Sequence, residues 1–407
     1  MKKKLTITFG MVVFLCALAM ATVWVPATSA GNPGVEKLKI GIIGPMSGAG
    51  AAWGINMQRG AALACDDVNT AGGLKVGNKV YMLDFVSADT AYIGATAVSE
   101  VSRLIFQERI KYIFGPIGST PCLAMQPIIN ENKVLHLHDS YTPKAVSPQA
   151  PYSFRAFCST SHEIAPVVWG YAKEKYGVKT MVTIGQNDAT GKAETDDDIM
   201  AAKTLGIKVL SRELFDLATT DFMPLMTKVV GMKPDAIEIG SAATGFCSEM
   251  IKCLYELGYK GIRVSNTLTG EAEIWVPIVG KKVCEGVISQ NVDWSSKDAT
   301  PMMRDLYERY VTKFGRPFGA AAGWIYCPIM WFADAVNATG SLDTDVLKKH
   351  FDRPGCKYQH YYGEVQFGGK VYYGINHQAK IPVPVSEIRD GKNVQVVPPK
   401  TPPLELE

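Results

Sequence analysis

The sequence predicts an α/β protein with two doubly wound parallel sheets, and three observations support this fold class. Short apolar runs that are typical of buried strands alternate with segments of helical length. The apolar runs lack strict alternation with polar residues, as expected of strands that are covered on both faces. The pattern restarts near Phe154, which indicates a second unit of the same kind.

The first unit holds four predicted strands and three predicted helices. The strands are residues 38–44, 80–86, 112–115 and 134–138. The helices between them are residues 51–69, 91–107 and 121–132. Because such alternating segments connect as right-handed βαβ units, they should form one parallel sheet with helices on both faces.

The second unit follows the same order. Its predicted helices are residues 163–176, 195–205, 222–230 and 246–257, and its predicted strands are residues 180–185, 208–214, 235–240 and 262–266. Three further helices are predicted at residues 301–314, 320–337 and 342–351. The tail then predicts hairpins with turns at Gly368-Gly369 and Asp390-Gly391.

The first thirty residues have the order of a secretory signal peptide. Lys2, Lys3 and Lys4 precede an apolar stretch over residues 5–25, and small residues then precede Gly31. We expect cleavage after Ala30 and export to the periplasm. The alternative is a retained membrane anchor, because the apolar stretch is long enough to span a bilayer.

Charge and cysteine content narrow the function classes. The whole chain carries a net charge of +3, and the three lysines of the signal segment account for it, so 3 − 3 leaves the mature chain near zero. A neutral chain has no basic surplus for nucleic acid, so we expect no nucleic-acid partner. Removing Cys16 from nine cysteines leaves eight, whose pairing stays open between disulfides and buried thiols.

The segment IGPMSGAGAAWG, residues 43–54, joins the first predicted strand to the first predicted helix. It has no lysine before the helix, as a phosphate loop requires. Trp53 stands at the sixth position of a dinucleotide fingerprint, where an indole would keep a pyrophosphate from the backbone. We therefore expect no nucleotide cofactor. Ser47 and the N–H groups of the helix start could bind a small polar group, and Trp53 could form an apolar wall.

Two more strand ends carry polar side chains. Ser119 and Thr120 follow the third predicted strand, and Asp139, Ser140 and Tyr141 follow the fourth. The alternative to a binding role is that Ser119 or Thr120 only caps a helix. Because ligands of open α/β sheets bind at the carboxyl ends of the strands, the three turns together predict one wall of a ligand site.

Other chemistries are less favoured. His136 and His138 share a face of a strand and could hold a metal, but His162, His350, His360 and His377 offer no third ligand at a telling spacing, so we expect no metal site. Gly115-Pro116-Ile117-Gly118-Ser119 does not match the nucleophile elbow of an esterase. The run Asp196-Asp197-Asp198 is interpreted as a solvated first turn of a helix.

Several segments resemble the leucine/isoleucine/valine-binding protein family, which comprises type I periplasmic solute-binding proteins of ABC transporters. They are IGPMSGAGAAWG, RGAALACDDVNTAGGL, IFGPIGSTPCLAMQPIINENKVLHL, PYSFRAF, VVGMKPDAIEIGSA, EMIKCLYELGY, CEGVISQ and NHQAKIPVPVSEIRDGKNVQVV. They span nearly all of the mature chain. The resemblance implies two Rossmann-like lobes joined by three crossover strands, with the ligand in the cleft between them. Residues 31–157 and 291–363 would form lobe one, and residues 158–290 and 364–407 would form lobe two.

The resemblance also assigns site residues. Ser119 matches the serine that binds a carboxylate, Asp139 and Tyr141 match the pair facing an α-amino group, and Trp53 matches an aromatic of the first turn. In the second lobe this sequence departs from the family pattern. The position of one aromatic residue of the family falls at Thr190-Gly191, and another aromatic is replaced by Ala242 or Ala243. The carboxylate that pairs with an ammonium falls near Leu268-Thr269, with Glu271 nearby.

These features lead to the expectation of a non-enzymatic solute-binding component of an ABC importer. It would capture a small organic solute, first of all a branched-chain or other neutral amino acid, by cleft closure and deliver it to the membrane permease. The alternatives are an aromatic carboxylate or amide as ligand, or a sensor role for a membrane receptor. A hydrolase that uses Ser119 or the His136 and His138 pair is the competing enzymatic hypothesis.

Overall fold

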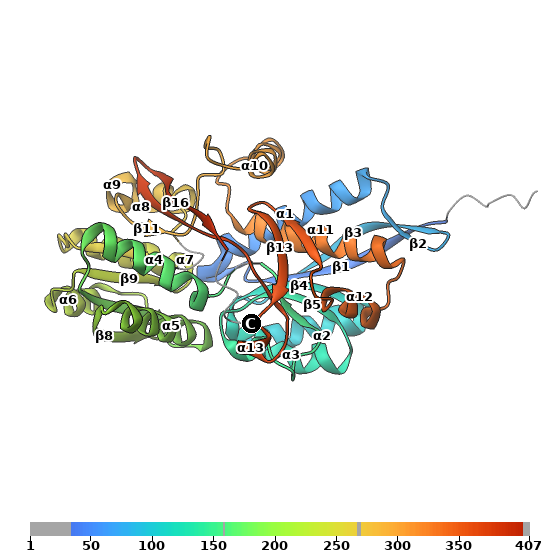
Figure 1. Cartoon of the computed structure of the whole chain (residues 1–407), viewed down its shortest axis with the longest axis horizontal. Helices are drawn as coiled ribbons and strands as arrows, with labels where there is room; N and C mark the ends of the chain where they lie inside the picture. The colour runs from blue at the N-terminus through green and yellow to red at the C-terminus, as the bar shows by residue number, and fades with distance from the viewer. Residues whose placement is uncertain (1–33, 158, 267–269, 402–407) are drawn as a thin grey trace, which may run out of the picture.

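The computed structural model describes residues 34–157, 159–266 and 270–401, and these form two lobes, each with one sheet covered by helices (Figure 1). The expected signal segment lies outside these residues. Within them, no helix combines the length and the apolar character needed to cross a membrane.

The sheet of lobe one has the strand order β12-β13-β14-β6-β5-β4-β1-β3-β2. The strands are β1 (Gly34–Gly44), β2 (Leu74–Val76), β3 (Lys79–Asp89), β4 (Tyr112–Ile117), β5 (Leu135–Asp139), β6 (Ser153–Arg155), β12 (Lys357–His360), β13 (Gly363–Gly368) and β14 (Gln378–Ala379). Every residue of β4 and β5 is buried, and both lie parallel to their neighbours. This explains their continuous apolar runs, because helices cover both faces.

The sheet of lobe two has the order β16-β15-β11-β10-β9-β7-β8. Its strands are β7 (Thr180–Gln186), β8 (Lys208–Phe215), β9 (Ala236–Ser241), β10 (Ile262–Ser265), β11 (Ile288–Ser289), β15 (Val383–Arg389) and β16 (Lys392–Lys400). The first five lie parallel to one another, and β15 joins β11 in the antiparallel sense.

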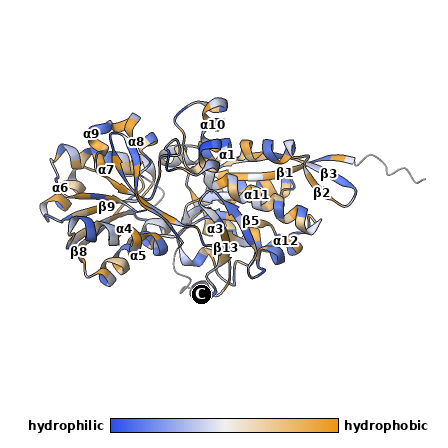
Figure 2. Cartoon of the chain, turned by 45° about the horizontal axis from the view of Figure 1, so that its top comes forward, coloured by the Kyte–Doolittle hydropathy of each residue, from blue (hydrophilic) through white to orange (hydrophobic). Residues whose placement is uncertain are grey.

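Helices cover both sheets. Those of lobe one are α1 (Ala51–Thr70), α2 (Gly94–Ser102), α3 (Ser119–Glu131), α10 (Pro301–Phe314), α11 (Ala321–Thr339), α12 (Thr344–Phe351) and α13 (Lys370–Tyr373). Those of lobe two are α4 (Ser161–Tyr176), α5 (Ala189–Leu205), α6 (Met223–Gly231), α7 (Thr244–Glu256), α8 (Ala272–Val279) and α9 (Lys281–Cys284). Figure 2 shows apolar colour along the central strands, while the helices carry both polar and apolar residues. This is the pattern of amphipathic helices on a buried sheet.

The tail differs from its prediction in two ways. Gly368-Gly369 does not turn a hairpin, because β13 ends at Gly368, Gly369 is the N-cap residue of α13, and β13 pairs with β12 and β14. Since β13 and β14 belong to the first sheet, the chain passes to the second sheet after Ala379, and the expected division at residues 363 and 364 does not follow the sheets. The Asp390-Gly391 hairpin is confirmed: both residues have positive φ, as a tight turn between β15 and β16 requires.

The acidic run is also placed differently. Helix α5 begins at Ala189, where the Asp188 carboxylate caps the N–H groups of Thr190 and Gly191, so residues 196–198 lie two turns inside the helix. Asp197 and Asp198 are buried. The sequence interpretation of a solvated first turn was therefore wrong.

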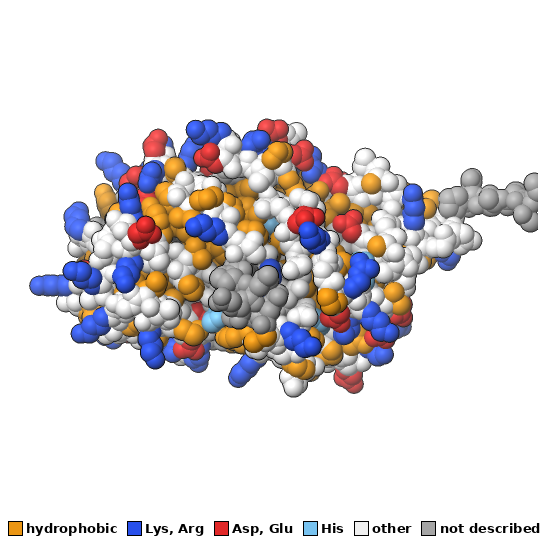
Figure 3. Space-filling model, viewed as in Figure 1, with side chains coloured by type: hydrophobic (Ala, Val, Ile, Leu, Met, Phe, Trp, Pro, Cys, Tyr) orange, Lys and Arg blue, Asp and Glu red, His pale blue; other side chains and the backbone are white. Residues whose placement is uncertain are grey.

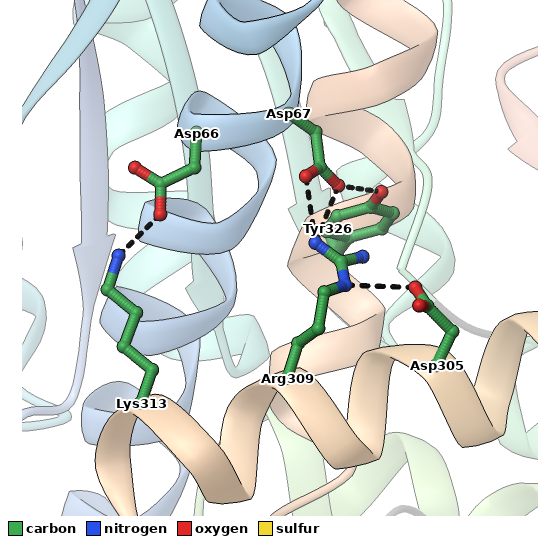
Figure 4. A network of polar contacts seen from close by, with 6 residues as sticks. All are labelled: Asp66, Asp67, Asp305, Arg309, Lys313 and Tyr326. Carbon is green, nitrogen blue, oxygen red and sulfur yellow. Dashed lines mark hydrogen bonds and ion pairs between the residues drawn. The ribbon is translucent and has the colours of Figure 1, made fainter.

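A polar network fastens α10 to the rest of lobe one (Figure 4). Arg309 donates from Nη1 to both carboxylate oxygens of Asp67, at 2.8 and 2.9 Å, and from Nε to Asp305 at 2.9 Å. The hydroxyl of Tyr326 on α11 donates to the same Asp67, and Lys313 pairs with Asp66. One carboxylate of α1 thus joins three helices.

The cysteines do not form a disulfide framework. Six of them are buried free thiols: Cys65, Cys122, Cys253, Cys284, Cys327 and Cys356. With these six free, four bridges are excluded, and the thiols behave as small apolar core residues.

Close packing of α1 on α11 makes Gly60 sensitive to substitution. A Cβ atom at Gly60 would lie 2.2 Å from the carbonyl oxygen of Ala322, a backbone atom that cannot turn away. We expect Gly60→Ala to lower the free energy of unfolding by about 1–3 kcal/mol. Gly170→Ala on α4 is the matched control, since nothing lies within 4 Å of its Cβ and helix propensity should favour alanine. Urea unfolding measures the stability of both variants. If Gly60→Ala were as stable as the wild type, the close approach of α1 and α11 would be contradicted.

Candidate ligand-binding site

The strand ends of lobe one meet lobe two through Ser119. Helix α3 begins at Ser119, after Gly118 with a φ of 106°, and Ser119 is completely buried. Its backbone N–H donates to Oγ1 of Thr190 on α5, at 2.7 Å, and its own Oγ accepts from the Thr142 N–H at 3.1 Å. The helix start of one lobe therefore contacts the helix start of the other directly.

Thr120 makes a second bond between the lobes. Its hydroxyl donates to Oδ2 of Asp188 at 3.0 Å and accepts from the Ala189 N–H at 3.2 Å. Asp188 is the cap of α5, so the same carboxylate that starts this helix also holds the start of α3. Hence Ser119, Thr120 and Thr190, which the sequence assigned to the site, lie together.

Two residues that sequence reasoning missed complete this contact. The hydroxyl of Tyr92 donates to Thr190 Oγ1 at 2.8 Å, and Gln186 Nε2 donates to the Tyr92 hydroxyl at 2.9 Å. Burial and the nearby Asp188 raise the pKa of Tyr92 well above its usual value, so the hydroxyl stays protonated. Tyr92 and Ala91 both have positive φ, at 62° and 47°. Backbone strain of this kind in non-glycine residues concentrates at functional sites. No sequence motif predicts it, so no signal in the sequence pointed to Tyr92.

The remaining site residues predicted in the first lobe lie at the ends of β5 and β1 and on α1. Asp139, Ser140 and Tyr141 are buried at the end of β5, and the Asp139 carbonyl accepts from the Gly118 N–H at 2.9 Å. Trp53 is buried on α1. Ser47 is exposed and bonds Asp89 of β3; although burial alone would raise the pKa of Asp89, hydrogen bonds from Ser47, Ala91 and Met46 hold it below its usual value.

A cavity opens between the lobes beside Tyr92. Its volume is about 400 Å³, and its walls come from lobe one (Ala49, Gly50, Ala91, Tyr92 and Ile93) and from lobe two (Asp216, Leu217, Ala218, Ala243 and Phe246). The walls are mostly apolar, with aromatic rings from both lobes. This shape and lining suit a small organic molecule.

Glu271 lies at a different cavity, of about 420 Å³, with Trp294, Phe318 and Asn393 among its walls. Figure 3 shows a group of hydrophobic side chains on the surface between β16 and α10. Glu271 accepts from the Ala320 N–H at 2.7 Å, and burial raises its pKa to about 8. The structure thus separates Glu271 from the Ser119 contact, while Thr269 lies outside the described residues.

The two histidines of β5 have a third neighbour that the sequence did not suggest, Cys122 on α3. One ligand atom from each of the three lies within 4.8 Å of the others. Both ring nitrogens of His136 are engaged, with Ser153 Oγ at 3.0 Å and the Gly115 carbonyl at 2.7 Å. Burial lowers the pKa of His136 to about 4 and raises that of Cys122 to about 12. A neutral, hydrogen-bonded histidine beside a protonated thiol is typical of a core.

The arrangement can bind a polar solute through donors and acceptors at helix starts. At the contact, Ser119 Oγ accepts from a backbone N–H, and Thr120 Oγ1 donates to a carboxylate that caps a helix. This geometry supports binding by hydrogen bonds and burial.

Comparison with known proteins gives one consistent family. The profile of the family described as "Periplasmic binding protein" matches residues 37–393. An "Amino acid binding protein" of Pseudomonas aeruginosa is 25% identical over 340 residues, which cover 83% of this chain and 88% of that protein. The "Leu/Ile/Val-binding protein homolog 3" of Brucella melitensis is 25% identical and covers 75% and 80% of the two chains.

Solved structures share the fold. The leucine binding protein LivK of Thermotoga maritima superposes with a TM-score of 0.74 at 21% identity, covering 88% of this chain and 97% of that one. A solute binding protein of an ABC transporter from R. palustris, in complex with 4-hydroxybenzoate, gives 0.75 at 22% identity, with coverages of 90% and 98%. Type I periplasmic binding proteins thus have the same two-lobe architecture.

Thr190 should control how firmly the lobes meet. Thr190→Val keeps the shape but removes the oxygen that accepts from Ser119 and Tyr92. Each donor left without a partner in the contact costs about 1–3 kcal/mol. The population of molecules whose lobes are apart should therefore rise roughly tenfold or more. Small-angle X-ray scattering of the ligand-free protein should show a larger radius of gyration. Thr195→Val, which removes a hydroxyl bonded inside lobe two, is the control, and the same expansion there would refute the assignment.

Glu271 should make stability depend on pH. Below about pH 4.5 the Glu271 carboxyl is protonated in both the folded and the unfolded chain. Between pH 4.5 and about 8 the carboxyl ionises in the unfolded chain but not in the folded one, so the free energy of unfolding falls as pH rises. Above about pH 8 the carboxyl is ionised in both states, and the free energy of unfolding falls no further. Glu271→Gln should match the wild type near pH 4.5 and exceed it at pH 8 by on the order of 1–3 kcal/mol. Urea unfolding at both pH values measures this. A pH-independent difference, or the same trend in exposed Glu308→Gln, would count against it.

Proposed function

Because the chain belongs to the periplasmic binding protein family, we propose that it is the exported solute-binding component of an ABC importer. The observation that carries the proposal is the direct bond between the lobes from the Ser119 N–H to Thr190 Oγ1, with Thr120 and Asp188 beside it. Helix starts that face each other across a cleft can both form hydrogen bonds to one solute. Closure of the lobes would bury it, and the closed form would be what the permease recognises.

We propose the cavity beside Tyr92 and the adjoining strand ends as the ligand site. Trp53, Ser119, Thr120, Asp139, Ser140, Tyr141 and Thr190 are its proposed contacts. Ser47 would act at the rim, and Glu271 would act near the second cavity. The proposed division follows the sheets, with lobe one continuing to about Ala379.

The first candidate solute is an amino acid, branched-chain or another neutral one. The relatives named for amino acid and Leu/Ile/Val binding support this class. An aromatic carboxylate or amide is the second candidate, because a fold neighbour holds 4-hydroxybenzoate and the cavity has aromatic walls. A sensor role for a membrane receptor would use the same site. In each case the chain would be exported to the periplasm, with cleavage after Ala30, and would catalyse no reaction.

A thermal-shift screen of the chain from Gly31 onward tests the proposal. Amino acids, aromatic acids and amides are added one at a time, after unfolding and refolding have removed any co-purified solute. A solute present at 100 times its Kd should stabilise the fold by about 2.7 kcal/mol and raise the unfolding midpoint. Recovery of each hit by mass spectrometry is the control. Chemically altered hits would support the hydrolase, and no hit at all would contradict solute binding.

A further inference from the structure

The end of lobe two that lies away from the cleft carries a lysine in each of four connections between a helix and the following strand. Lys179 directly precedes β7 and Lys208 begins β8, while Lys233 and Lys260 come shortly before β9 and β10. These four strands are neighbours in the sheet and lie parallel to one another, so all of them begin at the same edge. The four lysines therefore lie along one edge of the sheet, opposite the edge that faces lobe one.

Hydrogen bonds join these connections to one another. The Lys208 N–H donates to the Lys179 carbonyl at 2.8 Å, and the Lys179 N–H donates to the carboxylate of Asp235 at 2.9 Å. The Ile262 N–H, at the start of β10, donates to the Asp235 carbonyl at 2.8 Å. Because adjacent strands lie about 4.8 Å apart, the four connections span roughly 15 Å.

Three more lysines extend this edge from the last turns of α4 and α5. Lys173 and Lys175 lie on α4, and Lys203 lies on α5. The Nζ of Lys173 donates to the Leu205 carbonyl, so the ends of the two helices are neighbours. All seven side chains are exposed, and together they are called the basic pole: Lys173, Lys175, Lys179, Lys203, Lys208, Lys233 and Lys260.

Acids do not neutralise the basic pole. Among the residues that the structure describes, none of the seven lysines forms an ion pair, and the lobe-two lysines that do are others, such as Lys228 and Lys281. The same connections and last turns contain only three acids, Glu174, Asp235 and Glu256. The carboxylate of Asp235 accepts from two backbone N–H groups. Seven exposed cations against three acids leave a local surplus of positive charge.

Lobe one is built on the same plan, but it neutralises its corresponding lysines. Four lysines at or near the starts of β1, β3 and β5 each pair with an acid. The pairs are Lys37 with Asp84, Lys39 with Glu108, Lys79 with Glu36, and Lys133 with Asp345. Exposed pairs of this kind add little stability, but they cancel the local charge. The surplus is therefore a property of lobe two and not of strand starts in general.

Helix stabilisation accounts for only part of the basic pole. A lysine in the last turn of a helix interacts favourably with the helix dipole, which explains the three lysines on α4 and α5. The other four lie outside the helices, since the helices before them end at Tyr176, Leu205, Gly231 and Glu256. Their position therefore calls for a different explanation.

Two tyrosines lie beside the basic pole. Tyr176 ends α4 and Tyr255 lies in the last turn of α7, and their side chains are 42% and 48% exposed. Tyrosine is enriched where a membrane meets water, because its ring is apolar and its hydroxyl is polar. Lysines near such a surface are attracted by anionic lipid headgroups. Figure 3 shows Lys and Arg side chains over the left end of the molecule, which lobe two forms in Figure 1.

We propose that the basic pole docks lobe two on the surface of an anionic phospholipid membrane. Because it lies at the edge of the sheet opposite the cleft, docking leaves the cleft open to solution. For the exported solute-binding component proposed above, docking would hold the protein at the membrane that carries the permease, whether or not a solute is bound.

A lipid surface fits the basic pole better than a nucleic acid does. Neither the cavity beside Tyr92 nor the cavity beside Glu271 contains a residue of the basic pole, so its lysines do not line a groove that a strand could follow. The mature chain as a whole is also near neutral, which gives no broad attraction to a polyanion. A lipid surface, in contrast, needs only one charged end of the molecule.

Flotation with lipid vesicles tests the proposal. The chain from Gly31 onward is mixed with vesicles of phosphatidylcholine alone, or of equal parts phosphatidylcholine and phosphatidylglycerol. We expect binding to the mixed vesicles only, and weaker binding as the salt rises from about 50 to 300 mM, because screening shortens the reach of the charges. Equal binding to neutral vesicles, binding that salt does not weaken, or no binding to the mixed vesicles would overturn the proposal.

A quadruple variant tests the residues. Near an anionic surface each lysine changes the partition by about fivefold. Replacing the four connection lysines by glutamine, at positions 179, 208, 233 and 260, should therefore weaken vesicle binding tenfold or more. The matched control removes the same number of charges from lobe one: Lys37→Gln, Lys39→Gln, Lys79→Gln and Lys133→Gln. All eight lysines are exposed, so both variants should fold, which circular dichroism checks. The control should bind like the wild type, and an equal loss in both would reduce the effect to net charge.

Hydrogen exchange locates the docked surface. On mixed vesicles, exchange of the backbone amides should slow in residues 176–179, 205–208, 231–235 and 257–261, and should not change at the strand starts of lobe one. Slowing confined to other segments would overturn the role of the basic pole. Tighter binding of a DNA duplex than of the mixed vesicles would assign the basic pole to a different partner. The thermal-shift screen contains no vesicles, so failure of docking and failure of solute binding are distinguishable.

Discussion

Parallel strands of one sheet all end at the same edge, and the candidate site depends on this constraint. In lobe one it brings the ends of β1, β4 and β5 together, and in lobe two it brings the ends of β7 and β9 together. The ends of β4 and β7 lead into the starts of α3 and α5. Because the two edges face each other, Ser119 can donate directly to Thr190, and the cavity beside Tyr92 has walls from both lobes.

Two buried glutamates of lobe two show how differently the fold treats a charge. Glu163 pairs with Lys380 at 3.3 Å and accepts from the Thr160 N–H, so this carboxylate has both a cation and a donor where the chain passes between the lobes. Glu194 has neither a cation nor a donor for its Oε2 among the described residues. The fold therefore compensates the burial of Glu163 and leaves the burial of the Glu194 oxygen uncompensated, which costs free energy.

Sequence reasoning predicted that Ser119, Thr120 and Thr190 belong to the site, and the structure brings them together. The first two follow a strand that is easily recognised, and the third holds a position known from the resembling family. It missed Tyr92, whose role depends on a strained left-handed turn that no pattern marks. It also took residues 196–198 for an exposed first turn, because a run of three aspartates has high polarity and the start of α5 at Asp188 carries no strong apolar periodicity. The third passage between the sheets lies after Ala379 rather than at residue 364, because β13 and β14 both pair within the first sheet.

The amino-acid sequence by itself determined the fold class, because alternating buried strands and helices admit few arrangements other than doubly wound sheets. It also determined which edge of lobe one would carry polar groups. Only the tertiary structure decided which acids are buried and unpartnered, because pairing depends on side chains from segments far apart in the chain. Glu194, Glu238 and Asn266 are separated by dozens of residues, and the folding of α5 onto β9 and β10 alone brings their oxygens into one region that water does not reach.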